Sequence, residues 1–173
     1  MVQRSTYLKG THGASDALEF ELFFEAERRR LFRALYVMTG SGHEAEELLQ
    51  DAFLRIWERW DRVSVMDDPV GYLYRAAMNL ARSRLRRMIR AARVPVSPER
   101  SFEPHQAADD RDVVVRAVAR LSPRQRQAIV LVELLDRSTE DAADLMHVSL
   151  STVRSLTSEA RKAMRAAMES SDD

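Results

Sequence analysis

Residues 121–165 of this chain are the most informative part of its sequence and read LSPRQRQAIVLVELLDRSTEDAADLMHVSLSTVRSLTSEARKAMR. It divides into three short helical patterns, and each begins at a serine that suits a helix N-cap: Ser122, Ser138 and Ser149. A turn of about four residues, 146–149, separates the second pattern from the third. Two short helices joined this tightly predict a helix-turn-helix.

The last of these patterns has an apolar side and a polar side. Val153, Ala160 and Met164 recur at helical spacing and are expected to face inward. The residues expected to face outward are small or basic: Ser151, Thr152, Arg154, Ser155, Ser158, Arg161 and Lys162. The candidates for DNA contact are these residues without Arg161, together with Ser149. Because a short polar helix without bulky tips fits the major groove, the segment predicts DNA binding. The alternative is a three-helix bundle whose last helix is only solvated.

The composition of the whole chain is that of a globular protein built from helices. The 173 residues suffice for one domain or two small ones, and glycine is scarce, with five residues. There is no cysteine, which excludes disulfides, thiolate catalysis and cysteine zinc sites. No apolar run is long enough to span a bilayer, and residues 1–14 lack the apolar core of a signal peptide. We therefore expect a cytoplasmic protein without membrane insertion.

The net charge is zero, but the charges are unevenly distributed along the chain. Residues 40–68 hold eight acids and three arginines, a balance of −5. Residues 70–100 hold eight arginines and one acid, Glu99, a balance of +7. Such a basic block is either a solvated face or a nucleic-acid patch. An acidic surface beside a basic one indicates two partners of opposite character.

Four helices fit the first half of the chain, counting the exit from the leader, and three of them are long helical patterns. Residues 15–39 form the first, which Gly40 ends, and Ser41 with Glu44 forms a capping box for the second. Residues 61–68 are expected to be a loop, after which Asp68 and a proline at the first helical position begin a long helix that ends near residue 92.

The middle of the chain interrupts the helical patterns. Residues 94–110 contain three of the five prolines and no apolar periodicity, which predicts a flexible linker. The expected fold is all-α, with two small helical domains joined by this linker, the second a helix-turn-helix domain. The predicted parts are a leader (1–14), a first domain (15–93), the linker, a second domain (111–168) and a tail (169–173).

The order of these parts resembles the extracytoplasmic function (ECF) sigma factors, the smallest sigma factors of bacterial RNA polymerase. The resemblance covers residues 18–167 and rests on three motifs. They are TGSGHEAEELLQDAFLRIWERW (39–60), YLYRAAMNLARSRLRR (72–87) and LSPRQRQAIVLVELLDRSTEDAADLMHVSLSTVRS (121–155). The wording of the first motif is most similar to an actinobacterial subgroup. The resemblance implies a subunit that directs polymerase to promoters, acts at the nucleoid and has no catalytic centre.

The first motif implies the contact with core polymerase, made with its beta-prime and beta subunits. The residues implied, chiefly for the beta-prime clamp helices, are Glu47, Leu48, Gln50, Asp51 and Phe53. Acids beside apolar groups within two helical turns could hold a basic coiled coil. The alternative is that Leu48, Phe53 and Trp57 are core residues and the acids are solvated.

The second motif implies recognition of the minus-ten promoter element. The residues implied are Trp60, Arg75, Asn79, Arg82, Arg86 and Arg87. Asn79 carries a donor and an acceptor that suit the edge of a base flipped out of the DNA, and the arginines suit phosphates. The loop of residues 60–68 would complete the pocket. The alternative for Asn79 is a hydrogen bond between helices.

The third motif implies recognition of the minus-thirty-five element, with three departures from the family pattern. His147 stands where the family usually has glycine, and Leu156 and Glu159 stand where arginine or lysine is common. A left-handed His147 costs roughly 1 kcal/mol. Losing two potential phosphate contacts weakens DNA affinity, although Leu156 could contact a thymine methyl group.

No constellation in the sequence predicts an enzyme. The four histidines are scattered, and no phosphate-binding glycine loop occurs, so we expect no catalytic site, metal or cofactor. Most relatives are held by an anti-sigma factor, although no residue here points to one. Three other functions stay open: a helix-turn-helix regulator that acts apart from polymerase, a helical adaptor that binds only proteins, and a cofactor enzyme.

Overall fold

The structure is a computed structural model that describes residues 13–92 and 109–169. Every regular element in these ranges is helical. The elements are α1 (Ala14–Thr39), α2 (Gly42–Trp57), α3 (Trp60–Val63), α4 (Pro69–Ala92), α5 (Asp109–Ala119), α6 (Pro123–Ile129), the π-helix η1 (Val130–Leu134), α7 (Thr139–Met146) and α8 (Leu150–Glu169). The predicted all-α class is confirmed. Most of the predicted leader, linker and tail lies outside the described residues.

The predicted serine caps are present in the second half. The Ser122 hydroxyl accepts the Gln125 backbone N–H, and the Gln125 side chain accepts the Ser122 N–H in return, a capping box that begins α6. Ser138 caps α7, and Ser149 accepts the backbone N–H of Thr152 at 3.2 Å to begin α8. These helix starts follow from local chemistry alone.

The first half differs from the sequence prediction in two local details. Ser41 does accept the Glu44 N–H at 3.3 Å, but the reciprocal partner of the Ser41 N–H is the Thr39 hydroxyl and not the Glu44 side chain. The segment expected to be a loop after α2 contains the short helix α3. Asp68 caps α4 by accepting the Gly71 N–H at 2.8 Å, as a residue before an N-terminal proline often does.

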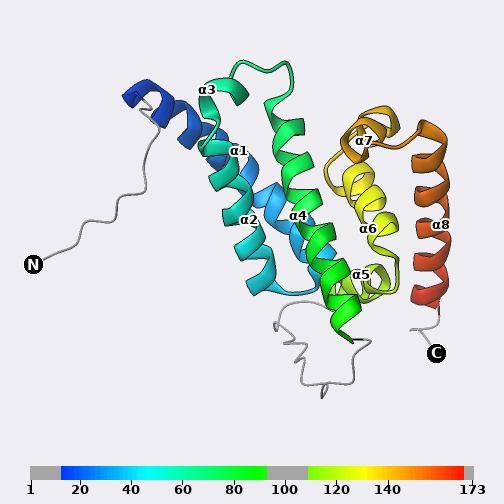
Figure 1. Cartoon of the computed structure of the whole chain (residues 1–173). Helices are drawn as coiled ribbons and strands as arrows, with labels where there is room; N and C mark the ends of the chain where they lie inside the picture. Colours follow the sequence, from blue (N-terminus) through cyan, green and yellow to red (C-terminus); the bar gives the residue numbers. More distant parts are fainter. Residues whose placement is uncertain (1–12, 93–108, 170–173) are drawn as a thin grey trace, which may run out of the picture.

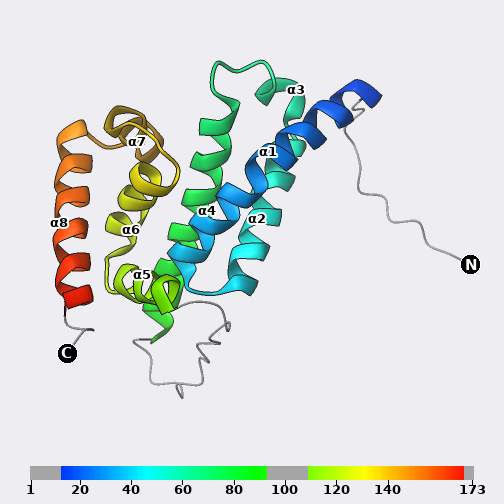
Figure 2. The ribbon, with the colours of Figure 1, turned by 180° about the vertical axis from the view of Figure 1, so that it is seen from behind.

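The helices form two packed groups that meet along α1 and α4 (Figure 1). In one, α2 packs on α1 and α4, and α3 covers one end; in the other, α6 packs on α8, with α5 and α7 at its ends. The view from behind shows α1 crossing both α2 and α4 (Figure 2). The second half contacts the first directly, because α5 and η1 pack on α1 while α6 and α7 pack on α4.

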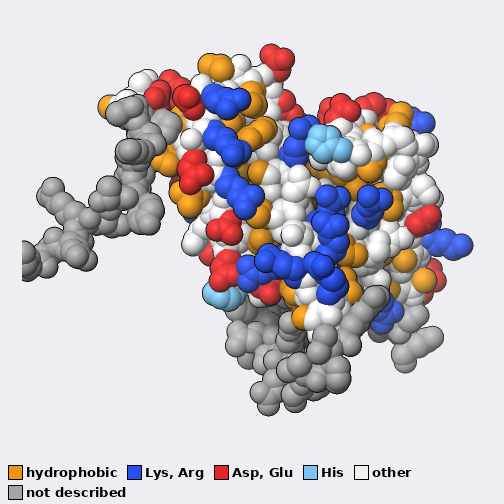
Figure 3. Space-filling view, in the orientation of Figure 1, with side chains coloured by type: hydrophobic (Ala, Val, Ile, Leu, Met, Phe, Trp, Pro, Cys, Tyr) orange, Lys and Arg blue, Asp and Glu red, His pale blue; other side chains and the backbone are white. Residues whose placement is uncertain are grey.

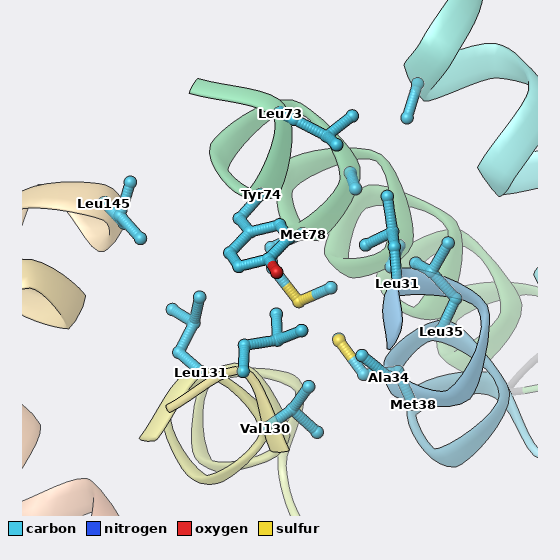
Figure 4. Packing of buried hydrophobic residues seen from close by; sticks show 14 of the residues in the cluster. Leu31, Ala34, Leu35, Met38, Leu73, Tyr74, Met78, Val130, Leu131 and Leu145 are labelled. Carbon is cyan, nitrogen blue, oxygen red and sulfur yellow. The ribbon is translucent and has the colours of Figure 1, made fainter. Parts of the chain in front are cut away.

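A continuous hydrophobic core joins the two halves. Met38 and Met78, which come from α1 and α4, lie opposite Val130 and Leu131 of η1 (Figure 4). Met38, Met78 and Leu131 are 0% exposed. Burying one such side chain stabilises a protein by about 1.5–3 kcal/mol. This interface was not anticipated from the sequence, which indicated two domains related only by a linker.

Candidate functional site

The helix-turn-helix has the geometry that its sequence predicts. α7 ends at Met146, and the next residue, His147, has a left-handed backbone with φ 53° and ψ 51°. The Val148 N–H then donates to the Ala143 carbonyl at 3.0 Å, which closes the turn. Histidine is among the residues that tolerate this conformation better than most. The replacement of the family's glycine therefore keeps the turn intact.

The outer face of α8 is the best-exposed candidate surface for DNA. Its exposed residues are Ser149, Ser151, Arg154, Ser155, Ser158 and Lys162, while Thr152 is half-buried. Val153 and Ala160 are fully buried as predicted, whereas Met164 is only partly buried. Thr157, which the sequence prediction missed, is also buried, and its hydroxyl donates to the Val153 carbonyl at 2.9 Å.

Two of the three departures from the family pattern have structural roles in α8. Leu156 is half-buried and packs against the core, so only part of its side chain is open to a thymine methyl group. Glu159 accepts a hydrogen bond from Gln125 of α6 at 3.1 Å and another from Ser155 at 3.0 Å. The carboxylate therefore fastens α8 to α6 and holds one of the predicted DNA-contacting hydroxyls.

Some of the predicted minus-ten residues of α4 are exposed, and others are hydrogen-bonded within the protein. Arg86 and Arg87 are exposed. Arg82 donates to the Asn79 side-chain oxygen at 3.3 Å, so the polar partner of Asn79 lies within α4 and not on another helix. Arg75 donates to the carbonyl of Asp144 in α7 at 3.4 Å.

Basic side chains gather where α4 and α6 lie side by side (Figure 3). Burial lowers the pKa of the Arg82 guanidinium, and the nearby charges of Arg86 and Arg124 lower it further. Arg124 belongs to α6, so positive charges from both halves of the molecule meet at this boundary. These clustered positive charges attract a polyanion such as DNA, and they also repel one another.

Trp60 does not lie on the DNA-facing surface where the resemblance placed it. The side chain is 4% exposed and packs with Phe20 and Phe23 at ring-centroid distances of 5.3 and 5.2 Å. Its indole nitrogen is buried without a hydrogen-bond partner. Trp60 is a core residue in this conformation because α3 turns it inward onto the aromatic residues of α1.

The predicted polymerase-binding residues of α2 also divide into two groups. Gln50 and Asp51 are exposed and Glu47 is half-buried, but Leu48 and Phe53 are only 2% and 4% exposed. The last two belong to the helical stripe that packs on α1 and α4, so the core alternative is correct for them. Glu47 pairs with Arg84 of α4 at 2.6 Å.

A groove beside the acidic surface supplies exposed apolar groups that the sequence analysis missed. It has a volume of about 530 Å³ and lies between the beginning of α1 and the second half of α2. Its lining includes Phe20, Phe24, Asp51, Leu54 and Trp57. Leu54 is 56% exposed. In the sequence, Leu54 lies off the apolar stripe of α2, where a leucine is unexpected, and this position could have indicated an exposed apolar contact.

The structure gives no sign of a metal centre or a membrane-spanning helix within residues 13–92 and 109–169. No group of three or more histidines, aspartates or glutamates is placed to hold a metal ion there. Over the same ranges, none of the helices is both long and apolar enough to cross a membrane.

Comparison with known proteins decides the family. The model of sigma-70 region 2 matches residues 23–91, and that of sigma-70 region 4 matches residues 111–164. The RNA polymerase sigma-E factor of Streptomyces avermitilis is 30% identical over 166 residues, covering 93% of this chain and 90% of that protein. The ECF RNA polymerase sigma factor SigG of Mycobacterium tuberculosis is 28% identical over 90% of this chain, which spans 50% of SigG. The chain belongs to the ECF RNA polymerase sigma factors.

This sigma factor also shares its fold with the sigma factor RpoE of Bartonella quintana, solved in complex with the anti-sigma factor NepR. The two align with a TM-score of 0.73 and 24% identity, over 87% of this chain and 97% of that chain. The resemblance read from the sequence is thus confirmed. Because both regions match in order, a helix-turn-helix regulator that acts apart from polymerase is not favoured. Sigma factors are non-enzymatic polymerase subunits.

Proposed function

We propose that this sigma factor binds core RNA polymerase through α2 and reads the two promoter elements with α4 and α8. The observation that supports this most is that different helices of one molecule carry an acidic surface, a basic face and an exposed polar face. Region 2 carries an acidic surface with an apolar groove on α2 and a basic face on α4. Region 4 carries a helix-turn-helix whose last helix exposes a polar, basic face. Acting with polymerase, the protein would work in the cytoplasm at the nucleoid.

The polymerase contact is assigned to the rim of the α2 groove. The lining of the groove combines the polar Gln50 and Asp51 with the apolar Leu54 and Trp57. A helix of the beta-prime or beta subunit with basic residues beside an apolar one would match both features, because charge steers the encounter and the apolar contact holds it. Glu47 contributes less in this proposal, since Arg84 already neutralises it.

The minus-ten contact is assigned to the exposed face of α4. Asn79 would hold a base edge once its bond to Arg82 is exchanged, and Arg86 and Arg87 would bind phosphates. The minus-thirty-five contact is assigned to α8. There Arg154 lies near the helix start, where helix-turn-helix proteins meet bases, and Lys162 lies two turns on, toward the backbone.

A run-off transcription assay with core polymerase tests the proposed function. We expect the full chain to produce transcripts from a defined set of genomic promoters, and sequencing of their starts gives both promoter elements. Core polymerase alone is the control. DNA binding by the chain in the absence of core, with no core binding in a pull-down and no specific transcript, would instead support a regulator independent of polymerase.

An anti-sigma factor remains a prediction for this chain. The solved relative RpoE of Bartonella quintana is bound to one, but that likeness concerns the fold. A pull-down with the full chain from the native bacterium, compared with the same experiment after adding excess core polymerase, tests whether a competing partner exists.

A further inference from the structure

One hydroxyl group on the exposed face of α8 has a fixed hydrogen-bonding role. Ser155 donates its hydroxyl proton to the Glu159 carboxylate, one helical turn further on, over 3.0 Å. A serine hydroxyl has one proton to donate and two lone pairs that accept. Because the carboxylate takes the proton, the Ser155 oxygen can offer only lone pairs to a molecule that approaches the exposed face of α8.

The Glu159 carboxylate is itself oriented by α6, which lies beside α8 (Figure 1). The amide nitrogen of Gln125 donates to Glu159 Oε2 at 3.1 Å, and the amide oxygen of Gln125 accepts the Ser122 backbone N–H at 3.0 Å. These two bonds use opposite ends of the amide, so the Gln125 side chain cannot turn over without losing both. The capping box that begins α6 therefore sets the direction of the hydrogen bonds as far as Ser155.

The hydroxyl groups at the start of α8 lack such a fixed direction. The Ser149 oxygen lies 2.9 Å from the Ser151 hydroxyl and 2.7 Å from the Thr152 hydroxyl, and either oxygen of each pair can be the donor. Hydroxyl groups that can exchange roles either accept from a base or donate to it. Ser155 differs from them because its proton is already bound by Glu159.

Ser155 and Glu159 together form an exposed patch that accepts hydrogen bonds and donates none. Both residues are exposed, and residues four apart lie on the same side of a helix. A carboxylate has about four lone-pair positions, and the bonds from Ser155 and Gln125 use two of them. The remaining positions and the lone pairs of the Ser155 oxygen face outward with a negative charge. We call Gln125, Ser155 and Glu159 the Glu159 network.

Cytosine is the base whose edge in the major groove matches such a patch. It presents an amino group that donates, whereas guanine presents two acceptors and thymine presents an acceptor and a methyl group. Adenine also has an amino group, but an acceptor nitrogen lies directly beside it. Two acceptors that face each other away from water leave both without a partner, which is unfavourable. The expected order of preference is cytosine, then adenine, then thymine and guanine.

We propose that Glu159 is a specificity-determining residue that selects cytosine at one position of the minus-thirty-five element, through its carboxylate and the Ser155 hydroxyl that it orients. The inference rests on the proposed function, because it names the base that α8 contacts at this point. Gln125 is a positioning residue, since it acts on the base only through Glu159. The carboxylate repels phosphates of any sequence, so the selectivity comes from rejecting the other bases as well as from contacting cytosine.

Substitutions at Glu159 test the inference in holoenzyme made with the full chain. The holoenzyme is bound to promoters that carry each of the four bases in turn at each minus-thirty-five position. With the parent protein, one position should favour cytosine by about fivefold or more. Glu159→Gln should move this preference to adenine, and Glu159→Arg should move it to guanine. The matched control is Glu169→Arg, the same change of charge at the exposed end of α8, which should leave every base preference unchanged.

Two further variants test the Glu159 network around the carboxylate. In Gln125→Glu, the new carboxylate still accepts the Ser122 N–H and keeps the capping box, but it repels Glu159 instead of donating to it. We expect the protein to remain folded and the cytosine preference to fall at that position alone. Ser155→Ala removes the oriented hydroxyl and should weaken the same preference without changing the salt dependence of binding, because no charge is altered.

The outcomes separate this inference from the proposed function. If the parent holoenzyme makes no specific transcript and binds every promoter variant alike, the proposed function fails whatever Glu159 does. If the parent discriminates between bases but Glu159→Gln and Glu159→Arg keep its preferences, the inference is overturned. An equal loss for every promoter variant, together with a lower melting temperature, would show that Glu159 only fastens α8 to α6. If Gln125→Glu keeps the full cytosine preference, the positioning role of Gln125 is disproved.

Discussion

The two candidate DNA-reading helices, α4 and α8, differ in how freely they present their polar faces. α8 lies at the outer edge of the molecule, with Arg154, Ser158 and Lys162 exposed (Figure 1). α4 lies between the halves, where Asn79 is bonded to Arg82 and Arg75 to α7. Both helices carry a polar face with basic residues in their sequences. We infer that a polar helix face predicted from the sequence is accessible to DNA only where no other part of the chain packs on it.

The largest expected effect tests the shared core on which this contrast depends. Leu131→Ala should destabilise the protein by about 2–5 kcal/mol, because the side chain is fully buried between the halves. Leu134→Ala is the control, since Leu134 is 38% exposed, and it should cost far less. Denaturant unfolding at equilibrium measures both. Two separate transitions in the parent protein would show that the halves do not share one core.

The recognition helix should give two different kinds of mutant. Arg154→Ala should cost about 1–3 kcal/mol at one base position of the minus-thirty-five element and relax the preference there. Lys162→Ala should lower affinity evenly and flatten the salt dependence by about one unit. Holoenzyme binding to promoter variants at several salt concentrations separates the two. If Arg154→Ala lowers the affinity equally for every promoter variant, Arg154 contacts phosphate and not a base.

On α4, Asn79→Ala tests whether a residue that is hydrogen-bonded within the protein still contacts DNA. Open-complex formation should fall by about 1–3 kcal/mol, with preference relaxed at one minus-ten position, while core binding is unchanged. Potassium permanganate footprinting of promoter variants measures this. A uniform loss over all variants, together with a lower melting temperature, would mean that the bond to Arg82 is purely structural.

The α2 groove should respond to charge and to apolar contact separately. Asp51→Lys and Leu54→Ser should each weaken core binding by about 1–2 kcal/mol, as truncation of interface residues commonly does. Neither should change folding much, because both side chains are exposed. His43→Lys, at an exposed site near the other end of α2, is the control. Unchanged titrations with labelled core for both variants would remove the groove from the interface.

The smallest expected effect concerns the left-handed turn. His147→Gly should stabilise the protein by about 0.5–1 kcal/mol, because relief of left-handed strain exceeds the extra entropy of glycine in the unfolded chain. Asp136 has a similar left-handed conformation, with φ 47°, but Asp136→Gly also removes the ion pair with Arg30. Its melting temperature should therefore rise less than that of His147→Gly. The reverse order would contradict this account of the turn.

The elements predicted correctly from the sequence are those with local causes. Ser122, Ser138 and Ser149 cap their helices through bonds to backbone three residues away, and Gly40 ends α1 in a left-handed conformation. The left-handed His147 follows from the spacing of the same motif. The caps and turns of the helix-turn-helix involve residues close in sequence, so their geometry was readable without a tertiary structure.

The long helices, the helix-turn-helix and the membership of a sigma-factor family could all be predicted from the sequence, whereas the short helix α3 could not. The tertiary structure decided which members of a motif reach the surface. It buried Leu48, Phe53 and Trp60, and it exposed Leu54 beside a groove. It also brought Arg137 to Asp68 across 69 positions of sequence. Helical periodicity specifies a face, but the neighbour that covers the face comes from distant parts of the chain, and burial and ion pairing depend on that neighbour.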